Sequence, residues 1–228
     1  MALSDEEVRR LAGELWDAER QSTPIQPISG RHPDADIDDA YRIQLAGVRL
    51  RTDAGDRVRG HKVGLTARVM QQQFGVERPD FGHLLASMFH PEGEPLAVDE
   101  LIAPRVEPEL AFVLDAPLRG PGVTVADVLG ATAFVLPALE IIDSRIEDWR
   151  IGIVDTVADN ASSAKVVLGG TRTRCPKWIP GSSAWCCDVT ERSWRPGRAA
   201  PCSAIRRRPS PGSPTRSRTT VVCSTPVT

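Results

Sequence analysis

The chain has 228 residues, a formal net charge of −2, and an ordinary composition that is 41% hydrophobic and 25% charged. That length suits one domain with a sizeable core. The sequence has no run of about 18 apolar residues, which disfavours a membrane span. Its acidic start, MALSDEEVRR, lacks the apolar segment of a secretory signal. We therefore expect a cytoplasmic protein without a membrane partner.

The composition changes abruptly near residue 171. Residues 1–170 carry 17 Lys and Arg against 28 Asp and Glu, a net charge of −11, whereas residues 171–228 carry 11 against 2, a net charge of +9. All five cysteines lie in this last segment, which contains no Leu, Phe or Met. Such a segment can bury too little apolar surface to offset the entropy lost on folding. The composition therefore predicts a disordered tail over residues 171–228.

Three origins of this tail compete. A nucleic-acid-binding tail is disfavoured because its ten arginines and one lysine follow no repeat. A metal or disulfide module is disfavoured because the tail has no CxxC pair and no histidine. Out-of-frame translation fits best. Ser, Cys and Trp codons mostly begin with T, and a shifted frame moves that base to the second position, where T encodes apolar residues. One allowed shifted reading gives two strands and an amphipathic helix. We predict a one-base deletion near codons 171–174 and no nucleic-acid partner.

The in-frame part begins with helical patterns. Ser4 and Glu7 have capping-box spacing at the start of a first helix. Residues 21–35 are rich in Pro, Ser and Gly and predict a loop, after which Asp36 starts a second helix. The residues expected to face the core are Val8, Leu11, Leu15 and Ala18 in the first helix and Ile37, Tyr41, Leu45 and Val48 in the second.

Strand patterns dominate from there to residue 170. Three strands are predicted over residues 59–65, 107–114 and 132–142, the last interrupted by Pro137. Two short helices are also predicted, one from Thr66 to Gly75 and one capped by Thr124. Because most helices precede the strands, the pattern favours an α+β fold over a regular βαβ array.

Two acidic residues near the start of the second predicted strand are candidate site residues. Side chains alternate along a strand, so Glu107 and Glu109 point to the same side, together with Ala111 and Val113, which are expected in the core. Two close carboxylates repel each other, and a hard divalent cation such as Mg²⁺ would relieve that repulsion. The alternative is a solvated strand edge without a ligand.

Glu140 lies inside the apolar run of the third strand, where a carboxylate needs a partner. One interpretation is a buried salt bridge with an arginine such as Arg145. The other is a three-carboxylate metal site with Glu107 and Glu109, which would leave open positions for a chelating ligand.

Polar residues elsewhere are candidates for proton transfer and substrate binding. Lys62 lies between small and apolar residues and is either a charge anchor and proton donor or a surface lysine. Its neighbour His61 is interpreted as a strand-edge histidine. The segment Pro79-Asp80-Phe81-Gly82 is typical of a turn, in which Asp80 is a candidate base. The polar segment 155–163 lines a pocket or forms a helix-capping loop.

Taken in order, these segments resemble the 2-hydroxypenta-2,4-dienoate (2-keto-4-pentenoate) hydratases of the fumarylacetoacetate hydrolase superfamily. The stretches that carry the resemblance, spread over about residues 5–170, are GHKVGLT (60–66), MQQQFGVERPDFGHL (70–84), RVEPELAFVL (105–114), VLPALEIIDSRIEDW (135–149) and DTVADNASS (155–163). The resemblance implies a mixed β-rich fold around one Mg²⁺ or Mn²⁺ ion. It implies metal ligands at Glu107, Glu109 and Glu140 and catalytic roles for Lys62 and Asp80. Substrate-binding roles are assigned to Ser162 and Ser163.

The resemblance also implies a reaction. The substrate would be a small 2-hydroxydienoic or 2-oxo acid, such as 2-hydroxypenta-2,4-dienoate from aromatic-compound catabolism, hydrated to 4-hydroxy-2-oxopentanoate. A related decarboxylase, a C–C hydrolase, or a non-catalytic truncated product is the alternative. The family commonly forms homo-oligomers. The expected organisation is an N-terminal helical region (1–58), a partial metal-binding β-rich domain (59–170) and the out-of-frame tail (171–228), which leaves the fold incomplete at its C-terminal end.

Overall fold

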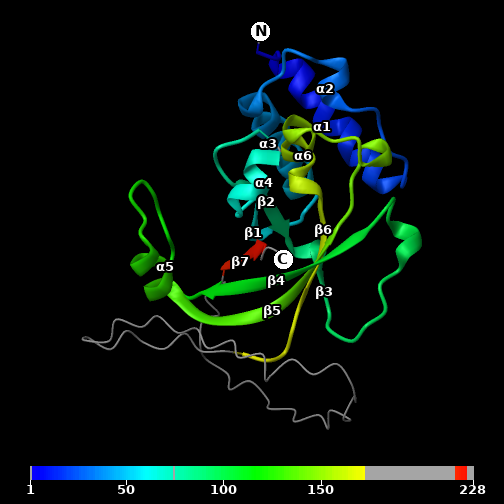
Figure 1. Cartoon of the computed structure of the whole chain (residues 1–228). Helices are drawn as coiled ribbons and strands as arrows, with labels where there is room; N and C mark the ends of the chain where they lie inside the picture. Colours follow the sequence, from blue (N-terminus) through cyan, green and yellow to red (C-terminus); the bar gives the residue numbers. More distant parts are fainter. Residues whose placement is uncertain (1, 74, 173–218, 225–228) are drawn as a thin grey trace.

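The computed structural model describes residues 2–73, 75–172 and 219–224. Four helices, α1, α2, α3 and α6, gather on one side of a curved seven-stranded sheet (Figure 1). This arrangement confirms the α+β fold expected from the sequence. Among the described residues, no helix has the length and apolarity needed to cross a membrane.

Helix α1 (Asp5–Arg20) begins where the cap pattern predicts. The Ser4 hydroxyl accepts a hydrogen bond from the Glu7 backbone N–H at 3.2 Å. Of the capping box, this half is present, while the Glu7 carboxylate binds Arg10 and His32 instead of the Ser4 N–H. The expected apolar face is confirmed, since the buried residues are Val8, Leu11, Ala12, Leu15 and Ala18.

The next segment requires two corrections. The predicted loop over residues 21–35 contains a one-turn helix, α2 (Ile28–Arg31), which buries Ile28 in the helical core. Helix α3 (Ile37–Asp53) begins at Asp36 as expected, but Ile37 and Leu45 are 40% and 43% exposed. Of the expected face, Val48 is buried and Tyr41 packs against the core, and the helix also buries Asp39, Ala40, Ile43 and Gln44. An apolar periodicity could not find this face because it includes polar residues that have buried hydrogen-bond partners.

The helices share one apolar core. Helices α1 and α3 pack against α6 (Ile153–Ala158), a helix that follows the sheet strands in sequence. Leu11, Ile43 and Val157, one from each helix, are fully buried there. Burying side chains of this size contributes roughly 1.5–3 kcal/mol each. The helical layer therefore joins the first 53 residues to a helix that follows β5 in sequence.

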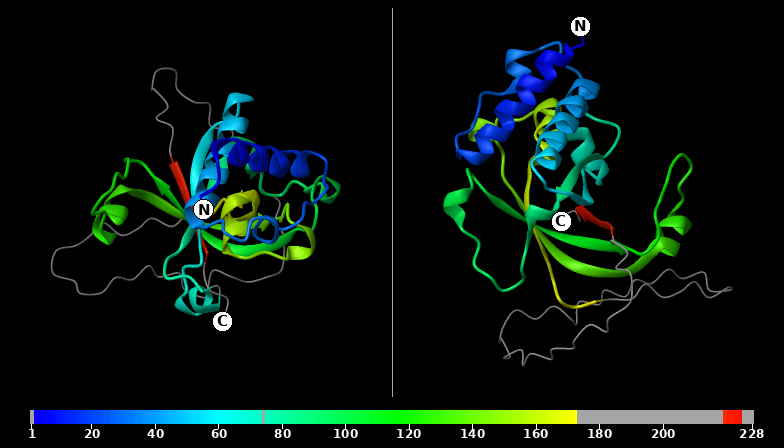
Figure 2. Two further views of the ribbon diagram at one scale, coloured as in Figure 1. Left: turned by 90° about the horizontal axis from the view of Figure 1, so that it is seen from above. Right: turned by 180° about the vertical axis from the view of Figure 1, so that it is seen from behind.

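The sheet is mixed, with strand order β2-β1-β7-β4-β5-β6-β3. Two neighbouring pairs, β1 with β7 and β3 with β6, are parallel, and the other four are antiparallel. The strands are β1 (Val58–Gly64), β2 (Asp80–Leu85), β3 (Phe89–His90), β4 (Arg105–Leu114), β5 (Thr132–Ile142), β6 (Ser163–Leu168) and β7 (Thr219–Ser224). The long β4–β5 ribbon curves beneath the helices (Figure 2). One of its faces joins a second apolar core, which includes Leu84, Ala111 and Val166.

The shorter elements bring further corrections. Helix α4 (Arg68–Gln73) begins two residues after Thr66, while Gly75 takes a positive φ of 66° just beyond its end. Helix α5 (Val125–Ala131) has the expected Thr124 cap. Strand β5 runs through Pro137 without interruption, because proline keeps its carbonyl as an acceptor, here for the Gly169 N–H at 2.8 Å.

The predicted tail falls mostly outside the described residues. Residues 173–218 and 225–228 are not described, so most of the segment predicted to be out of frame lies outside the described residues. The expectation of a tail without regular structure does not hold for Thr219–Ser224, which form β7 between β1 and β4. Backbone pairing with two neighbours explains why this short β-branched run can be ordered.

Candidate metal and proton-transfer site

The antiparallel register of β4 and β5 brings the three glutamates together. Glu107 lies directly opposite Glu140, and Glu109 lies two residues further along β4 on the same face. One oxygen from each carboxylate lies within 4.8 Å of the others. Like charges placed directly opposite in a sheet destabilise it. A solvated strand edge does not describe this cluster, because Glu109 and Glu140 are only 4% and 1% exposed.

Glu109 is buried in this cluster without a hydrogen-bond partner among the described residues. Both of its carboxylate oxygens are buried, and neither has a hydrogen-bond partner in the described part of the chain. Burial, followed by the charge of Glu140, raises the pKa of Glu109 to about 8. A buried carboxylate without donors is expensive unless a cation or a proton neutralises it.

Glu140 has partners on two sides. The Lys62 ammonium, from β1, lies 3.3 Å from Glu140 Oε2, and the Ser163 hydroxyl, at the start of β6, donates to Oε1 at 2.7 Å. The expected alternative partner, Arg145, instead forms a buried ion pair with Asp159 at 2.5 Å. Burial raises the pKa of Glu140, and Lys62 opposes that rise. Glu140 therefore joins the carboxylate cluster to Lys62.

Lys62 is buried, contrary to the surface alternative, with 6% of its area exposed. Burial alone would lower the pKa of its ammonium, but the charges of Glu140, Asp80 and Glu107 outweigh burial and raise that pKa. The ammonium is therefore held charged by the acidic cluster. His61, the preceding residue, points to the other face of β1, where its ring lies 4.9 Å from that of His83.

Asp80 is the first residue of β2 and not a turn residue as the sequence suggested. It lies opposite Gly64 in the β1–β2 pair, and a Cβ at Gly64 would overlap Asp80 Oδ1. That oxygen is buried and has no hydrogen-bond partner among the described residues. Burial raises the pKa of Asp80, while Lys62 lowers it. A carboxyl group with a raised pKa and a free oxygen is suited to exchange protons.

The two serines follow an unusual turn. Asn160, Ala161 and Ser162 have φ angles of 54°, 53° and 54°, although none is glycine. Such a conformation costs roughly 1–2 kcal/mol per residue, so surrounding contacts must hold it. The turn leaves Ser162 buried with an Oγ that lacks a partner within the described chain, while Ser163 reaches Glu140. Within the segment 155–163, Asp155 has the helix-capping role, since its carboxylate accepts from the Gly152 N–H at the start of α6.

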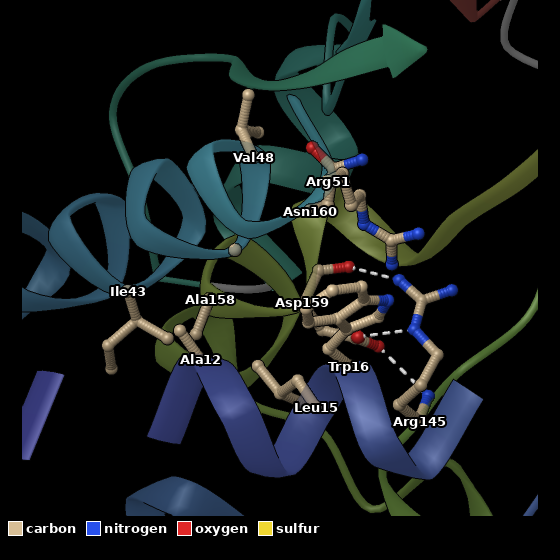
Figure 3. A pocket seen from close by; sticks show the side chains of 11 residues that line it. Ala12, Leu15, Trp16, Ile43, Val48, Arg51, Arg145, Ala158, Asp159 and Asn160 are labelled. Carbon is tan, nitrogen blue, oxygen red and sulfur yellow. Dashed lines mark hydrogen bonds and ion pairs between the residues drawn. The ribbon is translucent and has the colours of Figure 1, made fainter. Parts of the chain in front are cut away.

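Arg145 holds the base of this turn. Its guanidinium donates to the carboxylate and the carbonyl of Asp159 and to the Ser163 carbonyl at 3.1 Å. A small cavity of about 20 Å³, enough for roughly one water, lies beside this ion pair between α1, α3 and the turn (Figure 3). The cavity lies at the helical layer and has none of the three glutamates in its lining.

Sequence reasoning missed the residues that hold the site from outside. The Asn160 side chain bonds both backbone groups of His83, accepting from its N–H at 2.7 Å and donating to its C=O at 2.9 Å. Gln44 donates to the Phe81 and Val157 carbonyls, so its Oε1 accepts from His83 Nδ1 at 2.9 Å. The only sequence signal was that asparagine tolerates a left-handed conformation better than most residues.

The donor set fits a hard divalent cation. Three carboxylates have close oxygens, and both oxygens of Glu109 lack a partner among the described residues. This set matches the oxygen ligands that Mg²⁺, Mn²⁺ and Ca²⁺ take. The neighbouring ammonium of Lys62 compensates only part of the negative charge. The described residues therefore supply the ligands of a candidate metal centre with a lysine and an aspartate beside it.

Comparison with solved structures identifies the class of fold. The 4-oxalocrotonate decarboxylase from Pseudomonas putida G7, in a complex with magnesium and adipate, superposes with a TM-score of 0.72 and 36% sequence identity. The match covers 76% of this chain and 66% of the decarboxylase. A second structure of that decarboxylase, with calcium and acetate, gives the same TM-score at 35% identity. The fold is thus that of the fumarylacetoacetate-hydrolase-like enzymes, as expected.

Sequence comparison gives the family, although no family model matches the chain. The 2-hydroxypent-2,4-dienoate hydratase of Pseudomonas putida is 47% identical over 163 residues, which are 71% of this chain and 73% of that protein. The 2-hydroxyhexa-2,4-dienoate hydratase of Comamonas testosteroni is 44% identical, covering 75% and 66%. The 2-keto-4-pentenoate hydratase of Burkholderia vietnamiensis is 46% identical, covering 72% and 63%. The chain belongs to this 2-keto-4-pentenoate (2-hydroxypentadienoate) hydratase family, and it spans about two thirds of the length of these relatives.

Proposed function

We propose that the protein is a hydro-lyase that adds water to 2-hydroxypenta-2,4-dienoate, with Mg²⁺ or Mn²⁺ held by Glu107, Glu109 and Glu140. The observation that carries the proposal is the buried three-glutamate cluster, in which Glu109 has no other partner in the described chain. Its family membership, at 44–47% identity to three hydratases, supplies the reaction class. Small dienoates are the substrates in the names of two of these relatives.

The proposed reaction has two stages. Loss of the 2-hydroxyl proton and protonation at C5 convert the dienol to 2-oxopent-3-enoate, an electron-poor alkene. Water then adds its oxygen to C4 and a proton to C3, giving 4-hydroxy-2-oxopentanoate. A bound divalent cation would supply Lewis-acid stabilisation of negative charge on the substrate.

The residues beside the carboxylates have distinct proposed roles. Asp80, with its free buried oxygen and raised pKa, exchanges the proton between oxygen and carbon. Lys62, held as an ammonium by the acidic cluster, fixes Glu140 and stabilises developing negative charge. Ser162, whose buried hydroxyl has no partner in the described residues, is available to hydrogen-bond the substrate. Ser163 orients Glu140 and stands next to that contact.

Glu140→Gln tests the metal site directly. The substitution keeps the side-chain shape but removes the charge that faces Lys62, so we expect loss of dienoate turnover and loss of the rise in Tm that Mn²⁺ causes. A ligand at about 100 times its Kd adds about 2.7 kcal/mol of stability, which melting curves resolve. Glu6→Gln, on the exposed start of α1, is the matched control. Full activity of Glu140→Gln would exclude the proposed site.

A decarboxylase is the second candidate, favoured by the structural similarity to 4-oxalocrotonate decarboxylase. Both reactions would use the same carboxylates, so the substrate must distinguish them. We expect turnover of a dienoate monoacid to exceed decarboxylation of an oxalocrotonate-type diacid, because the identity to the hydratases is higher. The reverse preference would replace the hydratase assignment.

We also propose that residues after about 170 are translated out of frame. The support is the change of net charge from −11 to +9 at that point and the loss of Leu, Phe and Met. Resequencing the DNA at codons 170–175 tests this, and an unchanged reading frame would refute it.

Melting curves of the chain with and without Mg²⁺ separate a functional chain from a non-catalytic product, since only the former gives a cooperative transition that the metal shifts. Light scattering tests the homo-oligomer that the family resemblance implies.

A further inference from the structure

The turn Asn160–Ser162 lies where the two ends of the sheet approach each other. Strand β2 is at one end of the strand order, and β6 and β3 are at the other. The turn leads directly into β6, yet the side chain of Asn160 is bound to β2 at His83. Asn160 therefore bridges two strands that are not neighbours in the sheet.

The contact to β2 is built from both sides. The Asn160 amide satisfies the N–H and the C=O of His83 as a neighbouring strand would, and β2 is an edge strand. The next residue back, Gly82, admits the turn backbone, because a Cβ there would lie 2.6 Å from the Asn160 carbonyl oxygen. The turn thus rests on β2 with no room for a side chain between them.

This contact adjoins the proposed site on each strand. Gly82 lies opposite Lys62 in the β1–β2 pair, and Asp80 lies two residues before it. On the other side of the turn, Ser163 donates to Glu140. The two oxygens of Glu140 are therefore held by residues from opposite parts of the sheet, Lys62 and Ser163.

We infer that Asn160 is a positioning residue, which closes the curled sheet and sets the distance between Lys62 with Asp80 on one side and Glu140 with Ser163 on the other. Its left-handed backbone has no glycine to favour it, so the conformation persists only while the side chain and its neighbours hold it. Without the two bonds to His83, the turn is free to move away from β2. Ser163 then no longer holds the Glu140 carboxylate in a fixed orientation. This inference rests on the proposed function.

Mn²⁺ affinity of the full chain, measured by titration calorimetry, tests the inference without substrate. We expect Asn160→Ala to weaken Mn²⁺ binding about tenfold, since the loss of groups that orient metal ligands commonly costs 10–100-fold. Asn160→Gly removes the same bonds but tolerates the positive φ of 54°, so it keeps the test valid if the alanine variant does not fold. We expect the same loss of affinity in both variants.

A destabilised control separates positioning from general loss of stability. Ala12→Gly lowers stability within α1, far in sequence from the site, and should leave Mn²⁺ affinity unchanged. Glu140→Gln identifies the proposed function itself and should abolish binding. If Glu140→Gln abolishes binding while both Asn160 variants bind Mn²⁺ as the unaltered chain does, the positioning role is wrong and the metal site stands. If the unaltered chain binds no Mn²⁺, both are wrong.

Discussion

Two buried polar clusters lie a few residues apart in this protein, and they differ in how their charges are satisfied. Arg145 and Asp159 are each 2% exposed, and Arg145 gives its donors to Asp159 and to carbonyls around it. Glu109 is nearly as deeply buried, at 4%, yet neither of its oxygens has a partner in the described part of the molecule. Burial alone therefore does not distinguish a structural charge from a functional one. The unsatisfied cluster is the one that a ligand would complete.

The largest effect should come from breaking the satisfied pair. Arg145→Met leaves Asp159 buried without its counter-charge, so we expect the free energy of unfolding to fall by about 3–5 kcal/mol, as measured by urea denaturation. Arg150→Met is the control, because the Arg150 side chain is 54% exposed and pairs at the surface with Glu147; its loss should stay below about 1 kcal/mol. Similar losses in the two variants would show that the buried pair contributes no more than a surface pair.

Removing a charge from the three-glutamate cluster should instead raise the stability of the metal-free protein. Glu109→Gln removes a charge next to Glu140, so the metal-free protein at pH 8 should gain about 1 kcal/mol of stability while losing its rise in Tm with Mn²⁺. The pKa of Glu109 is raised to about 8 in the folded chain. Its stabilising contribution is therefore present below its ordinary pKa of 4.5 and is lost as pH rises through 8. A metal-free variant that is less stable than the parent at pH 8 would contradict this account.

A further pH effect should come from His83, the β2 residue that binds the Asn160 side chain. Burial, and then His61, lowers the pKa of His83 to about 4. The folded state thus binds fewer protons, and stability is lost as pH falls from 6.5 towards 4. His83→Gln keeps a donor for Gln44 but does not titrate. Between pH 7 and pH 5, its free energy of unfolding in urea should therefore fall by about 1 kcal/mol less than that of the parent. Equal losses would mean that His83 is not the titrating group.

The smallest effect should come from the first helix cap, outside both clusters. Ser4→Ala removes the acceptor for the Glu7 N–H, and because this cap is exposed we expect it to lower stability by only about 0.5 kcal/mol. Ser4→Asp retains an acceptor and should restore that stability in the same thermal melts. Neither variant should change Mn²⁺ affinity, and a change would indicate that the helical layer controls the site more widely than the Asn160 contact suggests.

Local patterns in the sequence were sufficient for several features. The cap at Ser4, the buried face of α1 and the strand containing Glu107 and Glu109 depend on spacing within a few residues, and the structure has them as predicted. The α+β fold and the family likewise follow from the order of elements and motifs. The α3 face was predicted only in part, with Val48 buried as expected, because Asp39 and Gln44 are buried by partners distant in sequence.

Only the tertiary structure decided how the charged residues combine. Strand alternation placed Glu107 and Glu109 on one face, but the β4–β5 register placed Glu140 opposite them, and no local pattern encodes that register. From the sequence, either Arg145 or a metal could have been the partner of Glu140. In the structure, Arg145 pairs with Asp159, and Glu140 pairs with Lys62. The physical reason is that a buried charge takes its partner from whatever the sheet brings within hydrogen-bond distance, and that is set by strand pairing across tens of residues.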